Sequence, residues 1–317
     1  MTSAVIEGLA PAQADPVLEL AAAAHAADGV APLSEQTVLH VRHGAVLGSG
    51  GRDWLVTGDD GAIAGYAHLD PPDVSDGDPG SGGSGPDTGD LSGELVVHPA
   101  HRRRGHGTAL VSALTAAAAG RGIRIWAHGD LPAAGEFAKT TGFTRVRELW
   151  QMLLPADVPV PEPTLPAGVT LRTFVPGADE EAWLAVNRRA FAHHPEQGGW
   201  TRADLELREA EPWFDPAGFF LAERSGELAG FHWTKVHPSG ASDGGPIGEV
   251  YVVGVDPAGQ GDGLGKALTI AGLAHLRARG LAEVMLYVDG DNTPATRLYA
   301  GLGFGRWHTD VMYRRSC

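Results

Sequence analysis

Apolar residues along this chain alternate between short β-type runs and longer helical repeats, and the same order of segments occurs twice. Residues 95–110 read LVVHPAHRRRGHGTAL, and residues 252–268 read VVGVDPAGQGDGLGKAL. In each passage a Val-rich run is followed by a Pro and by a Gly-x-Gly that opens an Ala/Leu-rich segment, which predicts strand, turn and helix. Gly105 and Gly263 lie half a chain length apart, so the repeating unit is a whole domain.

The second copy has the clearer pattern of elements. Hairpin signals join the early strands, at Asp59-Asp60-Gly61 in the first copy and at Ser225-Gly226 in the second. We therefore predict an α/β fold of two tandem domains, each with a mixed, mostly antiparallel central sheet flanked by helices. The expected strands of the second copy are 169–174, 218–223, 228–236, 249–255, 283–288 and 305–313, and the expected helices are 179–192, 202–210, 264–279 and 293–301.

A proline-rich segment separates the two copies. Residues 155–168 read PADVPVPEPTLPAG, a composition that favours an extended, semi-rigid connector. We therefore predict an N-terminal domain at 1–154, a linker at 155–168 and a C-terminal domain at 169–317. Residues 71–90 are of low complexity and are expected to form a loop.

Composition narrows the classes of protein to consider. The chain has 317 residues, 43% of them hydrophobic and 20% charged, with a net charge of −15. This acidic chain lacks the basic footprint of a general nucleic-acid binder. Its one cysteine excludes a disulfide framework and favours a reducing cytoplasm. Because the apolar run Leu20–Ala27 is too short to span a bilayer and no basic segment precedes it, we expect a cytoplasmic protein without a membrane partner. A monomer is expected separately.

The two glycine turns predict binding of a phosphate group. In Arg102-x-x-Gly105-x-Gly107 and Gln260-x-x-Gly263-x-Gly265, unpaired N–H groups at the start of a helix can donate to a pyrophosphate. A P-loop is rejected because it would need Gly at 260 and Ser or Thr at 267. A dinucleotide fingerprint fails at its third glycine, where Leu110 and Leu268 stand.

The glycine turn after a Val-rich strand, then a strand, an Asn-x-x-Ala-x-x-x-Tyr helix and Gly-Phe, resembles the GCN5-related N-acetyltransferase (GNAT) superfamily. Longer phrases resemble the mycothiol acetyltransferases of actinobacteria, namely FAHHPEQGGW at 191–200, GFHWTKVH at 230–237 and GEVYVVGVDP at 248–257. This resemblance implies two GNAT domains and acetyl transfer from acetyl-CoA. The implied acceptor is the cysteinyl amine of a cysteine-glucosamine-inositol conjugate, desacetylmycothiol, in the last step of mycothiol biosynthesis.

Amine acylation needs a group that takes the amine proton and a group that protonates the leaving thiolate. Glu249 begins a strand whose alternation places Glu249, Tyr251 and Val253 on one face, and we expect it to be the general base, acting through water. The resemblance places Tyr299 on the helix that faces the thioester sulfur, which implies that it is the general acid, since a phenol with a pKa near 10 can protonate a thiolate. The alternatives are a solvated strand-start carboxylate and a core tyrosine.

The first copy lacks both catalytic groups when the copies are aligned. Anchoring on the Gly-Phe pairs places Ala138 opposite Tyr299, and anchoring on the Pro of each turn places Leu91 opposite Glu249. The first domain is therefore predicted to be non-catalytic. Arginines at its turn favour a second, unreactive acetyl-CoA, and the alternative is a solvated basic turn.

The resemblance also implies contact residues. For acetyl-CoA in the second copy these are Val253, Gly254, Val255, Gln260, Gly261, Asp262, Gly263, Leu264, Gly265, Lys266, Asn292, Thr293, Pro294, Ala295, Thr296 and Arg297. For a second acetyl-CoA in the first copy they are Leu95, Val96, Val97, Arg103, Arg104, Gly105, His106, Gly107 and Thr108. For the acceptor they are Glu35, Glu196, Lys235, Glu249 and Tyr287.

Four further points arise from the sequence. Asp262 places a carboxylate beside a polyanion, and Glu35 could merely complement a helix dipole. Adjacent His193 and His194 point apart and have no evident third ligand, so no metal is expected. The competing functions are an acetyltransferase for another amine, such as a protein N-terminus or an aminoglycoside, and a non-catalytic acetyl-CoA-binding regulator.

Overall fold

The computed structural model describes residues 5–47, 51–70, 89–192, 194–240, 242 and 244–316. The chain forms two compact units. Unit 1 comprises residues 1–149 and 308–317, and unit 2 comprises residues 150–307. Within the described residues, none of the helices combines the length and the apolar composition needed to cross a bilayer.

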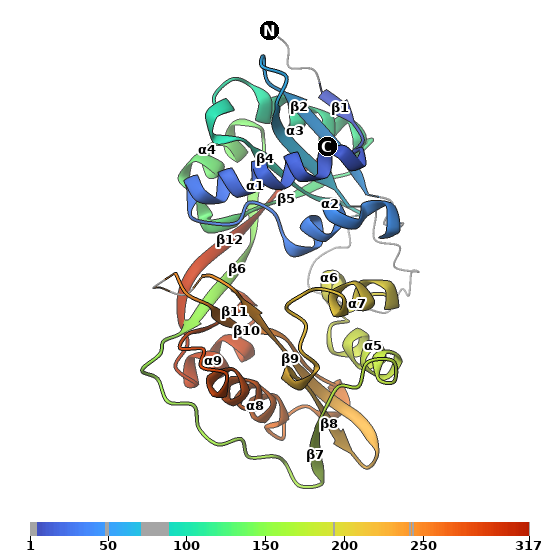
Figure 1. Cartoon of the computed structure of the whole chain (residues 1–317), viewed down its shortest axis with the longest axis vertical. Helices are drawn as coiled ribbons and strands as arrows, with labels where there is room; N and C mark the ends of the chain where they lie inside the picture. The colour runs from blue at the N-terminus through green and yellow to red at the C-terminus, as the bar shows by residue number, and fades with distance from the viewer. Residues whose placement is uncertain are drawn as a thin grey trace. The chain divides into compact units, whose positions relative to one another are not determined.

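Unit 1 is a mixed sheet between two pairs of helices (Figure 1). Its strands β1 to β5 lie in chain order, and β4 and β5 form its parallel pair. Apolar residues of α1 and α2 cover one face, and those of α3 and α4 cover the other. The strands are β1 (Val5–Glu7), β2 (Arg52–Thr57), β3 (Ile63–Leu69), β4 (Leu91–Val97) and β5 (Ile123–Ala127), and the helices are α1 (Ala14–Asp28), α2 (Glu35–Leu47), α3 (His106–Ala117) and α4 (Pro132–Thr140).

Unit 2 repeats this plan, with β10 and β11 as the parallel pair. The helices α5 and α7 pack on one face of its sheet through an aromatic cluster, and α8 and α9 pack on the other (Figure 1). The strands are β7 (Val169–Thr173), β8 (Phe219–Arg224), β9 (Glu227–His237), β10 (Ile247–Val255) and β11 (Val284–Asp289). The helices are α5 (Glu180–Ala190), α6 (Pro195–Gly198), α7 (Arg202–Glu209), α8 (Leu264–Ala278) and α9 (Thr293–Gly301).

The predicted fold class is confirmed, and the expected elements of the second copy agree with the structure to within a few residues. The hairpin turn between β8 and β9 has both Ser225 (φ 54°) and Gly226 (φ 84°) in the left-handed region, as a two-residue hairpin of the primed type requires. Most of the low-complexity stretch 71–90 lies outside the described residues.

The boundary between the compact units does not follow the proline-rich segment. The strand β6 (Thr144–Leu154) contributes residues 144–149 to unit 1 and residues 150–154 to unit 2. The strand β12 (Gly305–Arg315) contributes residues 305–307 to unit 2 and residues 308–315 to unit 1. The last residues of β12 pair antiparallel with β5, from Val311 opposite Ala127 to Arg315 opposite Ile123. The final strand of the second copy therefore completes the sheet of unit 1.

The proline-rich segment itself packs on unit 2. Val158 and Val160 contact the apolar cluster beneath α8 and α9, and the Arg277 guanidinium donates a hydrogen bond of 2.6 Å to the carbonyl of Pro155. Burial of these apolar side chains holds the segment against one unit, although its composition is that of a connector.

Candidate functional site

The parallel strands of unit 2 pair over only a short length. Gly248, Glu249 and Val250 of β10 lie opposite Val284, Met285 and Leu286 of β11, and within the described sheet β10 has no β11 partner beyond them. The peptide groups of β10 beyond Val250 therefore take no part in a ladder with β11. Polar main-chain groups left in this way are open to a ligand.

A β-bulge at Tyr251 changes which side chains share a face. Val250 lies opposite Thr234 of β9, but Val252 lies opposite Trp233, so Tyr251 is the extra residue. Tyr251 packs with Val252 in the aromatic cluster under α5 and α7, whereas Val253 packs in the cluster under α8. The prediction that Glu249, Tyr251 and Val253 share a face is therefore wrong for Val253, because simple alternation ends at the bulge.

Glu249 is a buried carboxylate with an imidazole partner. It is 5% exposed, and its Oε2 lies 2.6 Å from Nε2 of His237, the last residue of β9. Lys235 lies directly opposite Glu249 in the β9 ladder, and its ammonium sits over the rings of Trp213 at 4.4 Å and Tyr251 at 4.9 Å. Sequence analysis did not identify His237 as a partner of Glu249.

Tyr251 is held by α7. Arg208, which is buried, donates a hydrogen bond of 2.8 Å from Nε to the Tyr251 hydroxyl, and its guanidinium lies 3.8 Å from the centre of the Trp200 ring. These contacts fix the bulged residue from the side opposite to α8.

Tyr299 lies in α9 on the other face of the sheet from Glu249. It packs in the apolar cluster that contains Val250, with its ring 5.8 Å from that of Phe304. Burial raises the pKa of Tyr299 to about 12, so the phenol keeps its proton at neutral pH. The two predicted catalytic groups thus flank the segment where β10 and β11 cease to pair.

A cavity of about 500 Å³ opens at the glycine turn of unit 2. Gly263 is the N-cap residue of α8 with φ 91°, a conformation that favours glycine. Ten predicted acetyl-CoA contacts line the cavity, and they come from the end of β10, from the turn and from α9: Val255, Gln260, Gly261, Gly263, Leu264, Gly265, Lys266, Asn292, Pro294 and Ala295. The remaining predicted contacts of this copy are not among its lining residues.

The carboxylate of Asp262 is already paired. It forms an ion pair with Arg224 at the end of β8 and accepts a hydrogen bond of 3.1 Å from the Leu264 N–H. The Arg224 guanidinium lowers the pKa of Asp262. Arg224 therefore offsets the negative charge that Asp262 brings to the turn, a compensation that the sequence spacing does not reveal.

Unit 1 has a matching cavity of about 570 Å³. Gly105 caps α3 with φ 89°, as Gly263 caps α8. Of the predicted contacts, all but Arg104 line this cavity, together with Ala138. Arg102 is bound to Asp28 by two hydrogen bonds of 2.7 and 2.6 Å, so part of the basic charge at this turn is neutralised.

The strand pairing shows which residue of unit 1 corresponds to Glu249. The parallel pairing begins with Leu91 opposite Ile123 in unit 1 and with Gly248 opposite Val284 in unit 2. The next pair is Ser92 with Arg124 in unit 1 and Glu249 with Met285 in unit 2. The β3–β4 ladder runs without a register shift, so unit 1 lacks the extra residue of the bulge. The counterpart is therefore Ser92, and the prediction of Leu91 is wrong by one residue.

A buried carboxylate of unit 1 stands further along β4. Glu94 accepts hydrogen bonds from the Ser34 N–H, at 2.9 Å to Oε2, and from His128, whose other ring nitrogen contacts Asp310 at 3.0 Å. Burial lowers the pKa of His128, but the hydrogen bonds to Asp310 and Glu94 outweigh it and raise the pKa to about 10. Both imidazole nitrogens are used, so His128 is an ion-paired cation.

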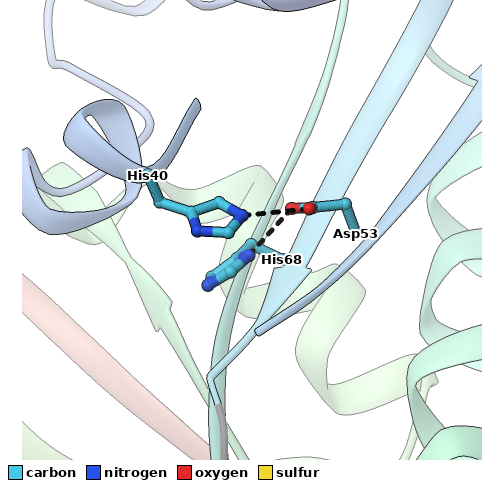
Figure 2. A group of neighbouring side chains, drawn as sticks. All are labelled: His40, Asp53 and His68. Atoms are coloured by element: carbon cyan, nitrogen blue, oxygen red, sulfur yellow. Dashed lines mark hydrogen bonds and ion pairs between the residues drawn. The ribbon is translucent and has the colours of Figure 1, made fainter. Parts of the chain in front are cut away.

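A second buried cluster lies between α2, β2 and β3 (Figure 2). The Asp53 carboxylate accepts hydrogen bonds from His40 at 2.9 Å, from His68 at 2.9 Å and from the Tyr66 hydroxyl at 2.7 Å. His40, Asp53 and His68 also bring three potential metal ligands within 4.8 Å of one another, a group that the sequence prediction of no metal did not consider. The three hydrogen bonds satisfy the buried oxygens of the Asp53 carboxylate.

The predicted acceptor contacts divide between the units. In unit 2, Glu249 lies opposite Lys235 of β9 on one side and opposite Met285 of β11 on the other. Tyr287 follows Met285 by two residues, so Lys235, Glu249 and Tyr287 lie on one face of the sheet. Glu35 is half-buried at the start of α2 in unit 1. The side chain of Glu196 and the whole of His193 lie outside the described residues; His194 lies 3.5 Å from Asp289.

Comparison with known proteins bears on these features. The family model for the acetyltransferase (GNAT) family matches residues 25–143 and again 183–304. Among curated relatives, the mycothiol acetyltransferase of Thermobispora bispora is 58% identical over 96% of this chain and 97% of its own length. That of Thermomonospora curvata is 58% identical over 97% of this chain and 95% of its own.

Solved structures show the same fold. A GCN5-related N-acetyltransferase from Sphaerobacter thermophilus is 30% identical, with a TM-score of 0.65 over 98% of this chain and 95% of that one. A tandem GNAT protein from the clavulanic acid biosynthesis pathway superposes with a TM-score of 0.70 over 98% of both chains at 22% identity.

Proposed function

The chain belongs to the acetyltransferase (GNAT) family as a tandem member related to the mycothiol acetyltransferases, and on that premise we propose the acceptor and the roles of its residues. The enzyme is an acetyl-CoA-dependent N-acetyltransferase. Its acceptor is the cysteinyl amine of desacetylmycothiol, and acetylation completes mycothiol. The observation that carries this proposal is the full-length identity of 58% to two mycothiol acetyltransferases.

The reaction assigns one proton transfer to each predicted catalytic residue. The amine nitrogen attacks the thioester carbon, the C–N bond forms and the C–S bond breaks. Glu249 takes the proton that the amine loses, through a water molecule, and Tyr299 donates a proton to the departing thiolate. The burial of both side chains supports these roles, because bulk water that could compete for the protons is kept away from them.

The glycine turn of unit 2 is the proposed pyrophosphate site. N–H groups of Gln260–Lys266 precede and begin α8, where the helix dipole favours an anion. A Cβ added at Gly263 would meet no atom within 4 Å, so the turn opens onto free space. Val253–Val255 supply main-chain groups to the pantetheine arm, and Asn292–Arg297 line its other side.

Unit 1 is proposed to bind a second acetyl-CoA without turnover. Its cavity has the same glycine-capped helix as unit 2, but Ser92 and Ala138 stand where the base and the acid would be. Arg103→Ala combined with Arg104→Ala should weaken a second CoA equivalent in calorimetry and leave kcat unchanged.

Assay of the purified enzyme against several amines tests the acceptor. Acetyl-CoA is supplied with desacetylmycothiol, with an N-terminal peptide and with an aminoglycoside, and CoA release and product mass are followed. We expect the highest kcat/KM for desacetylmycothiol. A higher kcat/KM for either of the other amines would overturn the proposed acceptor. If no CoA were released with any of the three amines, the non-catalytic regulator would be favoured.

A further inference from the structure

The contact between His237 and Glu249 joins a buried carboxylate to a group that reaches solvent. The Glu249 side chain is 7% exposed and the His237 side chain is 29% exposed, and the Nε2–Oε2 distance is 2.6 Å. A proton that Glu249 accepts must leave before the next turnover. The imidazole is the group beside Glu249 that can pass it on, because an imidazole exchanges protons at neutral pH.

The strand register places His237 at this position. His237 lies opposite Ile247, and Glu249 follows Ile247 by two residues, so both side chains are on the same face of the sheet. The two residues are therefore diagonal neighbours on adjacent antiparallel strands, within reach of long side chains.

The other charged or titratable groups of this face serve less well as proton acceptors. The side-chain nitrogen of Lys235 on β9 is engaged over two aromatic rings, and an ammonium is a donor without acceptor capacity. The hydroxyl of Tyr251 accepts a hydrogen bond from Arg208 of α7. On β11, Tyr287 is a phenol and Asp289 is paired with His194, so neither can replace an imidazole beside Glu249.

We propose that His237 orients the Glu249 carboxylate and relays its proton to solvent during acetyl transfer. After the C–N bond has formed, Glu249 holds the proton from the amine. The neutral imidazole of His237, with its hydrogen on Nδ1, takes this proton on Nε2, and Glu249 returns to the carboxylate. The imidazolium then donates from Nε2 to the Glu249 carboxylate and releases its Nδ1 proton to water. Proton exchange with water at the partly exposed ring returns the hydrogen from Nε2 to Nδ1 before the next turnover. His237 is thus a positioning and relay residue that rests on the proposed role of Glu249.

Two substitutions separate the relay from simple positioning. In His237→Gln the amide can still donate a hydrogen bond to Glu249 but cannot relay a proton, and in His237→Ala both functions are lost. We expect kcat to fall about tenfold or more in both variants, within the range of general base catalysis, with the KM for acetyl-CoA unchanged. Added imidazole should restore part of kcat in His237→Ala, in proportion to its free-base form, because the site is partly open to solvent.

Double mutants show whether His237 acts through Glu249. If it does, His237→Ala combined with Glu249→Gln should be no slower than Glu249→Gln alone, and imidazole should not rescue it. Additive losses, a wild-type kcat in His237→Gln, or the absence of imidazole rescue would each overturn the relay. His275→Ala, in α8 of the same unit, is the control and should not respond to imidazole.

The experiments distinguish a wrong relay from a wrong acceptor. The kinetics are measured with whichever amine the wild-type enzyme acetylates, so a wrong acceptor leaves the comparison between variants intact. For an enzyme that acetylates none, ¹⁵N NMR of the histidines decides: the His237 ring signals should move in Glu249→Gln and stay in place in Asp215→Asn. If they do not move in Glu249→Gln, the contact on which the relay depends is overturned.

Discussion

At the scale of single residues, the candidate chemistry of unit 2 depends on one carboxylate. Glu249 is buried between β9 and β11, with Lys235 opposite and His237 alongside. A group in this position can take a proton from an amine without competition from bulk water.

Replacement of Glu249 by Ala tests its role as base. We expect kcat to fall by roughly 10² or more, because general base catalysis supplies about 10² to 10⁴. The defect should shrink at high pH, where more of the substrate amine is unprotonated. Steady-state kinetics across pH measure this, and a loss that does not depend on pH would assign Glu249 to binding or structure.

Another single residue, His68, makes the stability of unit 1 depend on pH. Burial lowers the pKa of His68, but the hydrogen bonds to Asp53 and Asp70 outweigh it and raise the pKa to about 9. A raised histidine pKa stabilises the fold fully below the unfolded value of about 6.5, and this stabilisation is lost as the pH rises through about 9. We expect the free energy of unfolding to fall by about 3 kcal/mol across this window.

Urea unfolding at pH 6, 7.5 and 9 measures the effect of His68. The slope with pH should be smaller in His68→Gln, whereas His25→Gln, at an exposed position of α1, should keep the wild-type slope. His128 acts in the same direction, so part of the slope should remain in the variant. Equal slopes in His68→Gln and wild type would contradict the assignment.

At the scale of elements, the turn before α8 combines a feature that favours an anion with one that opposes it. The glycine-capped helix start presents N–H groups, while Asp262 accepts a hydrogen bond from the Leu264 N–H and holds Arg224. Removal of this carboxylate should therefore free both a donor and a cation for the cofactor phosphates.

The variant Asp262→Ala should lower the KM for acetyl-CoA about two- to fivefold, the range expected of an exposed charge pair. The gain should shrink at high salt because of screening. Asp215→Asn, which disturbs the similar pair with Arg279 at 2.7 Å, is a control for charge removal away from the cavity. An increase in KM would mean that Asp262 supports the turn more than it repels the cofactor.

At the scale of the whole molecule, each compact unit contains strand segments from both copies. A cut at the proline-rich segment would therefore remove part of unit 2. Met152 and Leu154 of β6 are 4% and 0% exposed, and both belong to the core beneath α8 and α9.

A fragment of residues 156–317 should be less stable than one of residues 150–317 by about 3–6 kcal/mol, because two buried apolar side chains are lost. A loss of this size can unfold a domain of ordinary stability. Thermal melting followed by circular dichroism compares the two fragments, and equal midpoints would show that β6 contributes nothing to unit 2.

Local patterns in the sequence were sufficient to predict the duplication, the strand-turn-helix passages and the glycines that cap the helices. They depend on residues a few positions apart: a left-handed φ that favours Gly263, a hairpin turn at Ser225-Gly226, and apolar periodicity. The roles of Glu249 and Tyr299 were predicted through resemblance and stay predictions.

Tertiary structure decided what depends on pairing between distant residues. The bulge at Tyr251 moved Val253 to the other face, and the ladders made Ser92 the counterpart of Glu249. The contacts of His237 with Glu249 and of Arg224 with Asp262 join residues 12 and 38 positions apart. Strand register and side-chain pairing arise only when separate segments pack together, so no local pattern in the sequence can specify them.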